Sequence, residues 1–233
     1  FPFHGIIRRR GIFMEKKNIP LSRWLSYLAG IFIMNTGIAL TIRAGVGLSP
    51  ISSLTRVMTV VYPPLSQGTY SFLLNFVMFF GEFVVLPKDF RLKNFTQLIP
   101  AMISGMFLDA NLYLFSFLAV ENYVLRLCLL VLGCAVLALG LYLMIEADLI
   151  LMPADAFNSV VVKRTRMKWG NVKSMVDCGL LVISAVIGLV FLGKIMFIRE
   201  GTLINAIICG QFIKMHTWIF NHLKKSVPEA AVN

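Results

Sequence analysis

Residues 37–54, GIALTIRAGVGLSPISSL, recur 103 residues later in the chain as residues 140–157, GLYLMIEADLILMPADAF. Aligned without a gap, the two stretches share six of eighteen residues, whereas roughly one or two matches are expected by chance at ordinary residue frequencies. The repeat continues beyond them, because residues 68–75 align with residues 170–177 at an offset of 102. The sequence therefore predicts one structural unit used twice.

The composition of the 233-residue chain is too apolar for a soluble globule. Hydrophobic residues make up 58% of the chain, charged residues make up only 14%, and the mean hydropathy is +0.81. Such a chain has too little polar surface to face water on all sides, so we predict an integral membrane protein that contacts lipid. The formal net charge of +11 does not indicate nucleic acid as a partner, because the 22 Lys and Arg residues gather mostly in tails and short loops between apolar runs.

The sequence contains no constellation of residues that is typical of an enzyme. The four cysteines lie inside apolar runs without a Cys-x-x-Cys pair, and the three histidines are scattered, so we expect no metal site. Neither a nucleophile with a neighbouring base nor a phosphate-binding loop is found. The sequence therefore predicts no cofactor and no enzymatic activity.

Long apolar runs divide the chain into two repeats. Residues 1–13 precede Met14, which begins a stretch typical of a natural bacterial start, so we interpret them as a leader or an added segment outside the fold. The first transmembrane repeat covers residues 14–121, the second covers residues 122–222, and residues 223–233 form a tail. The predicted spans are 24–42, 70–86 and 95–120 in the first repeat, and 123–145, 172–192 and 201–220 in the second.

A short apolar segment follows the first span of each repeat. Pro50 opens one segment, with Ser49 as its expected N-cap, and Pro153 opens the other. A helix over residues 51–62 covers only about 18 Å, whereas a hydrocarbon core is roughly 30 Å thick. We therefore predict that both segments are re-entrant half-helices.

The placement of positive charge favours an inverted repeat. With the N-terminal tail in the cytoplasm and both half-helices re-entrant, 16 of the 22 Lys and Arg residues lie on the cytoplasmic side, together with the C-terminal tail. If the short helices crossed instead, the basic loop 88–93 would lie outside and the second repeat would be parallel to the first. The predicted fold is thus all-α and integral to the bacterial inner membrane, with two inverted repeats of three transmembrane helices and one half-helix each.

The starts of the two half-helices carry the predicted substrate site. Irregular backbone at membrane depth is tolerated only against protein or a wet cavity, because its peptide groups otherwise lack partners. If both half-helices begin near the midplane, their positive dipole ends face one point and favour an anionic or dipolar solute. The candidate substrate-binding residues are Ser49, Pro50, Ser52 and Ser53 in the first copy, and Pro153, Asp155 and Asn158 in the second. Two alternatives stay open: the loop glycines only permit close helix packing, and Asp155 only caps its helix.

Four polar residues within the spans are further candidates. Asp109 and Lys214 occupy equivalent places when the last spans of the two repeats are aligned at an offset of 105. Charges inside a membrane usually pair or line a path, so we predict an Asp109–Lys214 pair, which either holds the halves together or serves transport. Asn75 and Asp177 are also related by the repeat, and they either relay a proton or cation or simply hydrogen-bond neighbouring helices.

Three of these motifs resemble a family of bacterial multispanning membrane proteins. Residues 44–50, AGVGLSP, residues 152–155, MPAD, and residues 200–202, EGT, are similar to the YczE/YyaS/YitT group, and the resemblance covers about residues 20–220. It implies a small inner-membrane protein of a kind commonly assigned as a transporter without an established substrate. The chain departs from the family pattern at Asp148, which stands in place of a glycine in the second copy.

These observations lead us to expect a small-solute transporter or channel that works by relative motion of two inverted halves around the half-helix junction. Two alternatives stay open. One is a membrane accessory or assembly protein that transports nothing and uses its polar groups only to hold helices together. The other is a subunit that captures substrate for a larger transport complex. A homo-oligomer or another membrane partner is compatible with each of them.

Overall fold

The computed structural model describes residues 20–87 and 90–226. The segment predicted as a leader, the end of the predicted tail at residues 227–233, and Lys88 and Asp89 of the basic loop lie outside the described residues. Within the described part the chain is helical and has no strand, which confirms an all-α fold. In chain order the elements are α2 (Leu21–Ala44), α3 (Pro50–Val61), α4 (Gln67–Val85), η1 (Leu92–Gln97), α5 (Leu98–Leu114), α6 (Tyr123–Ala147), α7 (Pro153–Thr165), α8 (Trp169–Leu192) and α9 (Glu200–Ser226).

Five of the described helices are long and apolar enough to cross a membrane, namely α2, α4, α6, α8 and residues Glu200–Phe220 of α9. Several of them carry large apolar side chains on their outer faces. Val84 on α4 is 68% exposed, and Phe191 on α8 is 67% exposed. Apolar surface of this kind suits contact with lipid, and it indicates a membrane protein.

The predicted third span, 95–120, is shorter in the structure and is divided between two elements. The 3-10 helix η1 comes first, and α5 then has only 17 residues, which span about 25 Å. Pro100 lies in the first turn of α5, where its missing N–H costs nothing, so the α-helix begins just before it. The apolar run therefore overstated the length of the regular helix.

Both half-helices begin where the sequence predicts. The Ser49 hydroxyl accepts a hydrogen bond from the Ser52 amide at 3.4 Å, and Pro50 is the first residue of α3. Pro153 is likewise the first residue of α7, which extends to Thr165. With 12 and 13 residues, α3 and α7 cover about 18–20 Å each, which is too short to cross a membrane.

The helices that precede the half-helices end in the same way. Gly45 caps α2 in the left-handed conformation at φ 67°, and Asp148 caps α6 in that conformation at φ 47°. The two residues are equivalent in the repeat. Asp tolerates the left-handed region better than most residues, so the exchange of glycine for Asp148 keeps the same backbone turn.

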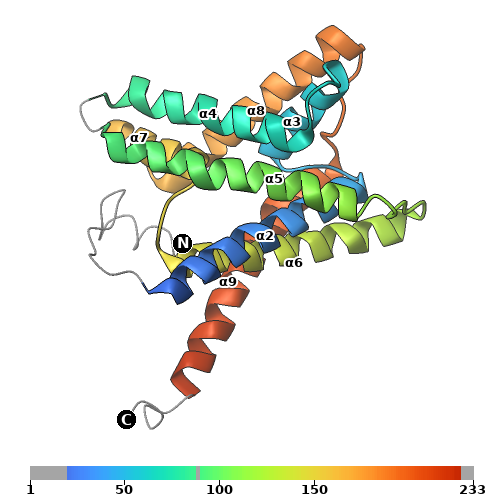
Figure 1. Cartoon of the computed structure of the whole chain (residues 1–233). Helices are drawn as coiled ribbons and strands as arrows, with labels where there is room; N and C mark the ends of the chain where they lie inside the picture. The colour runs from blue at the N-terminus through green and yellow to red at the C-terminus, as the bar shows by residue number, and fades with distance from the viewer. Residues whose placement is uncertain (1–19, 88–89, 227–233) are drawn as a thin grey trace.

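The antiparallel pair of α2 and α6 lies at the centre of the bundle (Figure 1). Their backbones cross closely at two glycine contacts, Gly30 with Gly140 and Gly37 with Gly133. A Cβ atom on Gly140 would lie 2.6 Å from the Gly30 carbonyl oxygen, and one on Gly37 would lie 2.6 Å from the Gly133 carbonyl oxygen. Small residues thus allow close backbone approach, as in many membrane helix pairs.

The remaining helices pack around this pair. α5 packs against α2 and α4, α9 packs against α6, α3 packs against α8, and α7 packs against α4. Figure 1 shows α4 and α5 side by side, and the C-terminal end of α9 extends beyond the other helices.

Candidate functional site

The two half-helix starts lie at opposite ends of α2, so they do not share the midplane point that we predicted. The loop before α3 leaves α2 at Ala44, while the Tyr27 hydroxyl near the other end of α2 donates to the Ile150 carbonyl oxygen just before α7, at 2.6 Å. Tyr27 and Ala44 are 17 residues apart in one helix, which corresponds to about 25 Å. Figure 1 accordingly shows α3 and α7 on opposite sides of the bundle. The prediction failed because each loop follows a full-length helix and therefore starts at a helix end.

The loop before α3 is held against the start of α9. The Gly201 amide donates to the Val46 carbonyl oxygen at 3.0 Å, and the Leu48 amide donates to the Phe197 carbonyl oxygen at 3.2 Å. At the crossing, a Cβ atom on Gly47 would lie 2.5 Å from the Thr202 nitrogen. Backbone from the two repeats therefore meets directly at this end of the molecule.

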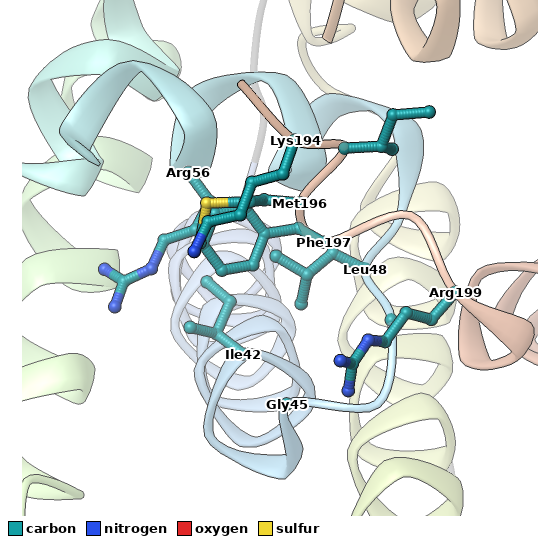
Figure 2. A pocket seen from close by; sticks show the side chains of 10 residues that line it. Ile42, Gly45, Leu48, Arg56, Lys194, Met196, Phe197 and Arg199 are labelled. Carbon is teal, nitrogen blue, oxygen red and sulfur yellow. The ribbon is translucent and has the colours of Figure 1, made fainter. Parts of the chain in front are cut away.

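A cavity of about 320 Å³ opens beside this contact. Its wall comes from the end of α2, the loop before α3, α3 itself and the segment that joins α8 to α9. Three of the residues that line it are cationic, Arg56, Lys194 and Arg199, and the described lining contains no acidic residue. Figure 2 shows Arg56 and Lys194 on one side of the cavity and Arg199 on the other.

Among the cationic groups at the cavity, Arg199 interacts with the neighbouring Glu200, whereas Arg56 lies among aromatic and basic groups. The Arg56 guanidinium lies 6.0 Å from the centre of the Phe197 ring, which is a weak cation–π contact at most. Burial, and then the positive charge of Arg43, lower the pKa of Arg56. Arg43 itself donates to the Leu112 carbonyl oxygen at 2.6 Å, while its buried Nε has no hydrogen-bond partner in the described part of the chain. Positive charge is therefore concentrated at this end of α2, and the described lining of the cavity holds no acidic residue.

The backbone at Phe197 is strained. Its φ is 65°, a left-handed value that bulky residues rarely adopt and that costs on the order of 1–3 kcal/mol. The strained turn presents the Phe197 carbonyl oxygen to Leu48 and the ring to Arg56. Strain of this kind often marks a functional site.

This arrangement suits an anion. Guanidinium and ammonium groups form charge-assisted hydrogen bonds with carboxylates and phosphates, and a partly enclosed wall strengthens them. The cavity volume is at the lower end of the range for small-molecule sites. A small anionic solute therefore fits both the charge and the size of the cavity.

The predicted residues of α3 lie beside the cavity, without lining it in the structure. The Ser49 hydroxyl donates to the Ser52 hydroxyl at 3.0 Å, and Pro50 starts the helix. The fully buried Ser53 hydroxyl lies 3.2 Å from the hydroxyl of Ser184 on α8. In the structure these serines cap α3 and attach it to α8.

The predicted residues of α7 lie at the other end of the bundle. Pro153 and Asn158 are buried, and the Asn158 Oδ1 has no hydrogen-bond partner in the described part of the chain. Asp155 is half-buried in the first turn. Burial raises the pKa of its carboxyl, Lys173 lowers it, and Asp177 raises it. The structure thus separates these three residues from the predicted serines.

Asp109 binds the start of α4. Its carboxylate accepts from the Ser66 hydroxyl at 2.5 Å and from the Gly68 amide at 2.7 Å. The free N–H groups of a first helical turn attract a carboxylate, and α4 packs directly against α5. This contact differs from the predicted pair with Lys214, which is an exposed residue of α9, the helix that packs against α6.

The predicted relay residues are not joined in the described part of the chain. The Asn75 amide donates to the Ser71 carbonyl oxygen in its own helix at 2.9 Å. Asp177 forms an ion pair with Lys173, one helical turn away, at 3.3 Å. These contacts stabilise single helices and need no relay.

Sequence reasoning missed the cationic cavity. Arg43 ends a long apolar run and Arg56 lies within a short one, and no motif marks either of them as part of a site. Lys194 and Arg199 lie in a loop that carries no motif. One available signal was the presence of an Arg in a segment of otherwise apolar, uncharged residues, because such charges are usually functional. Among the described residues, no group of three or more His, Cys, Asp or Glu is placed to hold a metal ion.

Comparison with known proteins identifies the family of the chain. No curated protein and no solved structure matches it. The resemblance to the YczE/YyaS/YitT group is not confirmed by any of these comparisons. A family of unknown function, DUF6198, matches residues 21–217, which are most of the chain. The protein therefore belongs to the DUF6198 family.

Proposed function

We propose that the protein is a multi-pass membrane transporter or channel for a small anionic solute, which binds in the cationic cavity beside α3. The observation that carries the proposal is the cavity itself, where Arg56, Lys194 and Arg199 face a space of about 320 Å³ without an acidic residue in the described lining. Cationic groups that converge on one cavity without an acidic residue in its wall repel one another, and a bound anion would relieve that repulsion.

The distribution of charge along the chain supports this role. In the proposed topology, with both termini in the bacterial cytoplasm, six of the 22 Lys and Arg residues lie away from the cytoplasmic side. They are Arg43, Arg56, Arg126, Lys194, Arg199 and Lys214. Three of the six line the cavity, and Arg43 lies near Arg56. Four of the six exceptions to the positive-inside rule thus gather at the outer end of α2.

We further propose that the two repeats are inverted relative to each other, with α5 as a sixth span and with α3 and α7 re-entrant. Residues 103 positions apart are equivalent in the two repeats, so Gly30 corresponds to Gly133 and Gly140 corresponds to Gly37. The contact of Gly30 with Gly140 therefore has an equivalent contact, that of Gly133 with Gly37, as an inverted repeat requires. Gly81 likewise contacts the Phe157 ring, and the equivalent residues are Ser184 and Leu54. The neighbour of Leu54, Ser53, forms a hydrogen bond with Ser184, so the second repeat has a closely similar contact. Antiparallel crossing of α2 and α6 agrees with a two-fold axis in the membrane plane.

The contact between α4 and α5 differs from the equivalent one between α8 and α9. This difference supports relative motion of the two repeats. A Cβ atom on Gly68 would lie 2.0 Å from the Gly105 carbonyl oxygen, so α4 and α5 are in close contact. Their equivalents, Gly170 on α8 and Gly210 on α9, would meet nothing within 4 Å. In a transporter with alternating access, the two repeats exchange such arrangements, and we propose that α8 and α9 close when α4 and α5 separate.

The proposed function is tested by flux into liposomes that contain the purified protein. The solute panel should include inorganic anions and small carboxylates, with neutral and cationic solutes of similar size as controls. We expect saturable uptake of at least one anion and none of the cations. Absence of flux for the whole panel, together with a membrane partner that co-purifies, would favour the accessory or substrate-capturing alternatives.

The proposed orientation is tested separately. A single cysteine introduced in the loop 88–93 is expected to resist a membrane-impermeant thiol reagent added to intact cells, because this loop faces the cytoplasm in the proposed topology. Labelling from outside would overturn the re-entrant assignment of the half-helices, but it would leave the anion proposal standing.

A further inference from the structure

A second polar cluster lies far from the cavity, where the last turn of α4 meets η1. Glu82 is 1% exposed, and it is surrounded by Asn94 and Gln97, which are 4% and 0% exposed. The Asn94 Nδ2 and the Gln97 Nε2 both donate to the Glu82 Oε2, each at 3.3 Å. A carboxyl group is therefore buried among amides.

Two oxygens of this cluster remain without a donor. The Glu82 Oε1 and the Gln97 Oε1 are both buried and have no hydrogen-bond partner in the described residues. Buried acceptors are costly when unpaired, and two in one cluster call for an explanation. A carboxylic acid and a primary amide can pair through two hydrogen bonds, so a proton on the Glu82 Oε1 would give the Gln97 Oε1 the donor that it lacks.

Both hydrogen bonds to the Glu82 carboxyl are longer than typical charge-assisted hydrogen bonds. Amide donors approach an ionised carboxylate to about 2.7–2.9 Å, since charge assistance shortens the bond. Both donors to the Glu82 Oε2 lie at 3.3 Å instead. A bound metal cation is a poorer explanation, because hard cations take roughly six or more oxygen ligands, and only two oxygens are unpaired in this cluster.

Glu82 also has no counter-charge in the described structure. The charged residues on the elements that pack around the end of α4 are Arg56 on α3, Arg91 and Lys93 at η1, Asp109 on α5, and Asp155, Lys163 and Arg164 on α7. None of them forms an ion pair with Glu82. Asp109 binds Gly68, which lies 14 residues before Glu82 in the same helix, or about 21 Å away.

We infer that Glu82, Asn94 and Gln97 form a proton-binding site, in which the Glu82 carboxyl is neutral and donates from Oε1 to the Gln97 side-chain oxygen. Loss of the proton leaves a buried negative charge on Glu82 beside the unpaired Gln97 Oε1. That repulsion weakens the contact between α4 and η1, so the corner before α5 responds to pH. The site does not depend on the proposed anion transport, because it is defined by these three residues alone.

The test is infrared difference spectroscopy of the purified full-length protein in lipid. We expect a C=O stretching band of a neutral carboxyl at neutral pH, which disappears at alkaline pH and is missing in Glu82→Gln. The matched control Asp177→Asn removes the partly exposed carboxyl of the Lys173 pair and should keep the band. A band that persists in Glu82→Gln, or a wild type without any neutral carboxyl at neutral pH, would overturn the inference.

Two further measurements keep the test decisive if Glu82→Gln does not fold. Gln97→Leu retains Glu82 but removes its acceptor, so the band should move to higher frequency, and an unchanged frequency contradicts the inference. The melting temperature of the wild type should fall as pH rises from mildly acidic to alkaline, because folding depends on the bound proton. A melting temperature that stays constant over this range also contradicts the inference.

Discussion

Gly47 and Gly201 cross so closely that neither position has room for a side chain. A Cβ atom on Gly47 would lie 2.5 Å from the Thr202 nitrogen, and one on Gly201 would lie 2.5 Å from the Val46 carbonyl oxygen. The crossing joins the loop before α3 to the start of α9, and Gly47 at this crossing lines the cationic cavity.

Gly201→Ala is expected to lower the melting temperature of the purified protein. The added methyl group collides with backbone atoms, which cannot rotate away as a flexible side chain can, so a cost of about 1–3 kcal/mol is expected. Gly170→Ala is the matched control, because a Cβ atom there meets nothing within 4 Å. Equal melting temperatures for the two variants would contradict the close crossing.

Alanine substitutions at the crossing of α2 and α6 should destabilise the protein to the same extent in both repeats. In Gly37→Ala the new Cβ would lie 2.3 Å from the Leu137 nitrogen, and in Gly140→Ala it would lie 2.2 Å from the Met34 nitrogen. Both variants should therefore yield less monodisperse protein on gel filtration than Gly179→Ala, which has open space. A large difference between Gly37→Ala and Gly140→Ala would argue against equivalent roles.

Asp109→Ala should loosen the start of α4. The substitution removes the acceptor for the Ser66 hydroxyl and the Gly68 amide, and it is expected to cost about 1–3 kcal/mol. Hydrogen exchange should accelerate at the amides of the first turn of α4. Asp177→Asn, which breaks only a partly exposed ion pair, should change stability by at most about 1 kcal/mol. Unchanged exchange in α4 would show that Asp109 does not cap that helix.

A disulfide between Gly170→Cys and Gly210→Cys tests the proposed exchange of helix contacts. Neither position is crowded, so both substitutions should be tolerated in a protein whose native cysteines are replaced. The disulfide should form under mild oxidation if α8 and α9 close during transport. The pair Gly179→Cys with Gly210→Cys is the control, since nine residues along α8 shift the first cysteine by about 13 Å. Equal cross-linking of both pairs would reflect random motion rather than closure.

The sequence predicted the positions of most helices along the chain, but it did not predict how these helices pack. Hydrophobic runs located the five long helices, and the Ser49-Pro50 signal located the start of α3, because capping and proline chemistry act locally. The separation of the two half-helix starts depends on full-length α2 lying antiparallel to α6, which is a tertiary relationship. The pair Gly30 and Gly133 was visible at the same offset of 103 residues, and it would have indicated how the two helices cross.

The sequence did not predict the cationic cavity either, because the cavity also depends on tertiary packing. Arg56 and Lys194 are 138 residues apart in the chain, and they meet only because α3 packs against α8. The buried cluster at Glu82 likewise needs the turn between α4 and η1. Local patterns do not reveal which loops meet at a helix end.

The most direct test of the account compares anion flux in two arginine variants. Arg56→Gln removes one charge from the cavity, and Arg164→Gln removes one from the exposed end of α7. A charged hydrogen bond is worth about 1.5–3 kcal/mol, so Arg56→Gln should weaken the apparent affinity for the transported anion by roughly tenfold or more. Arg164→Gln should leave flux unchanged. Equal anion flux in Arg56→Gln and wild type would contradict a transport site in the cationic cavity.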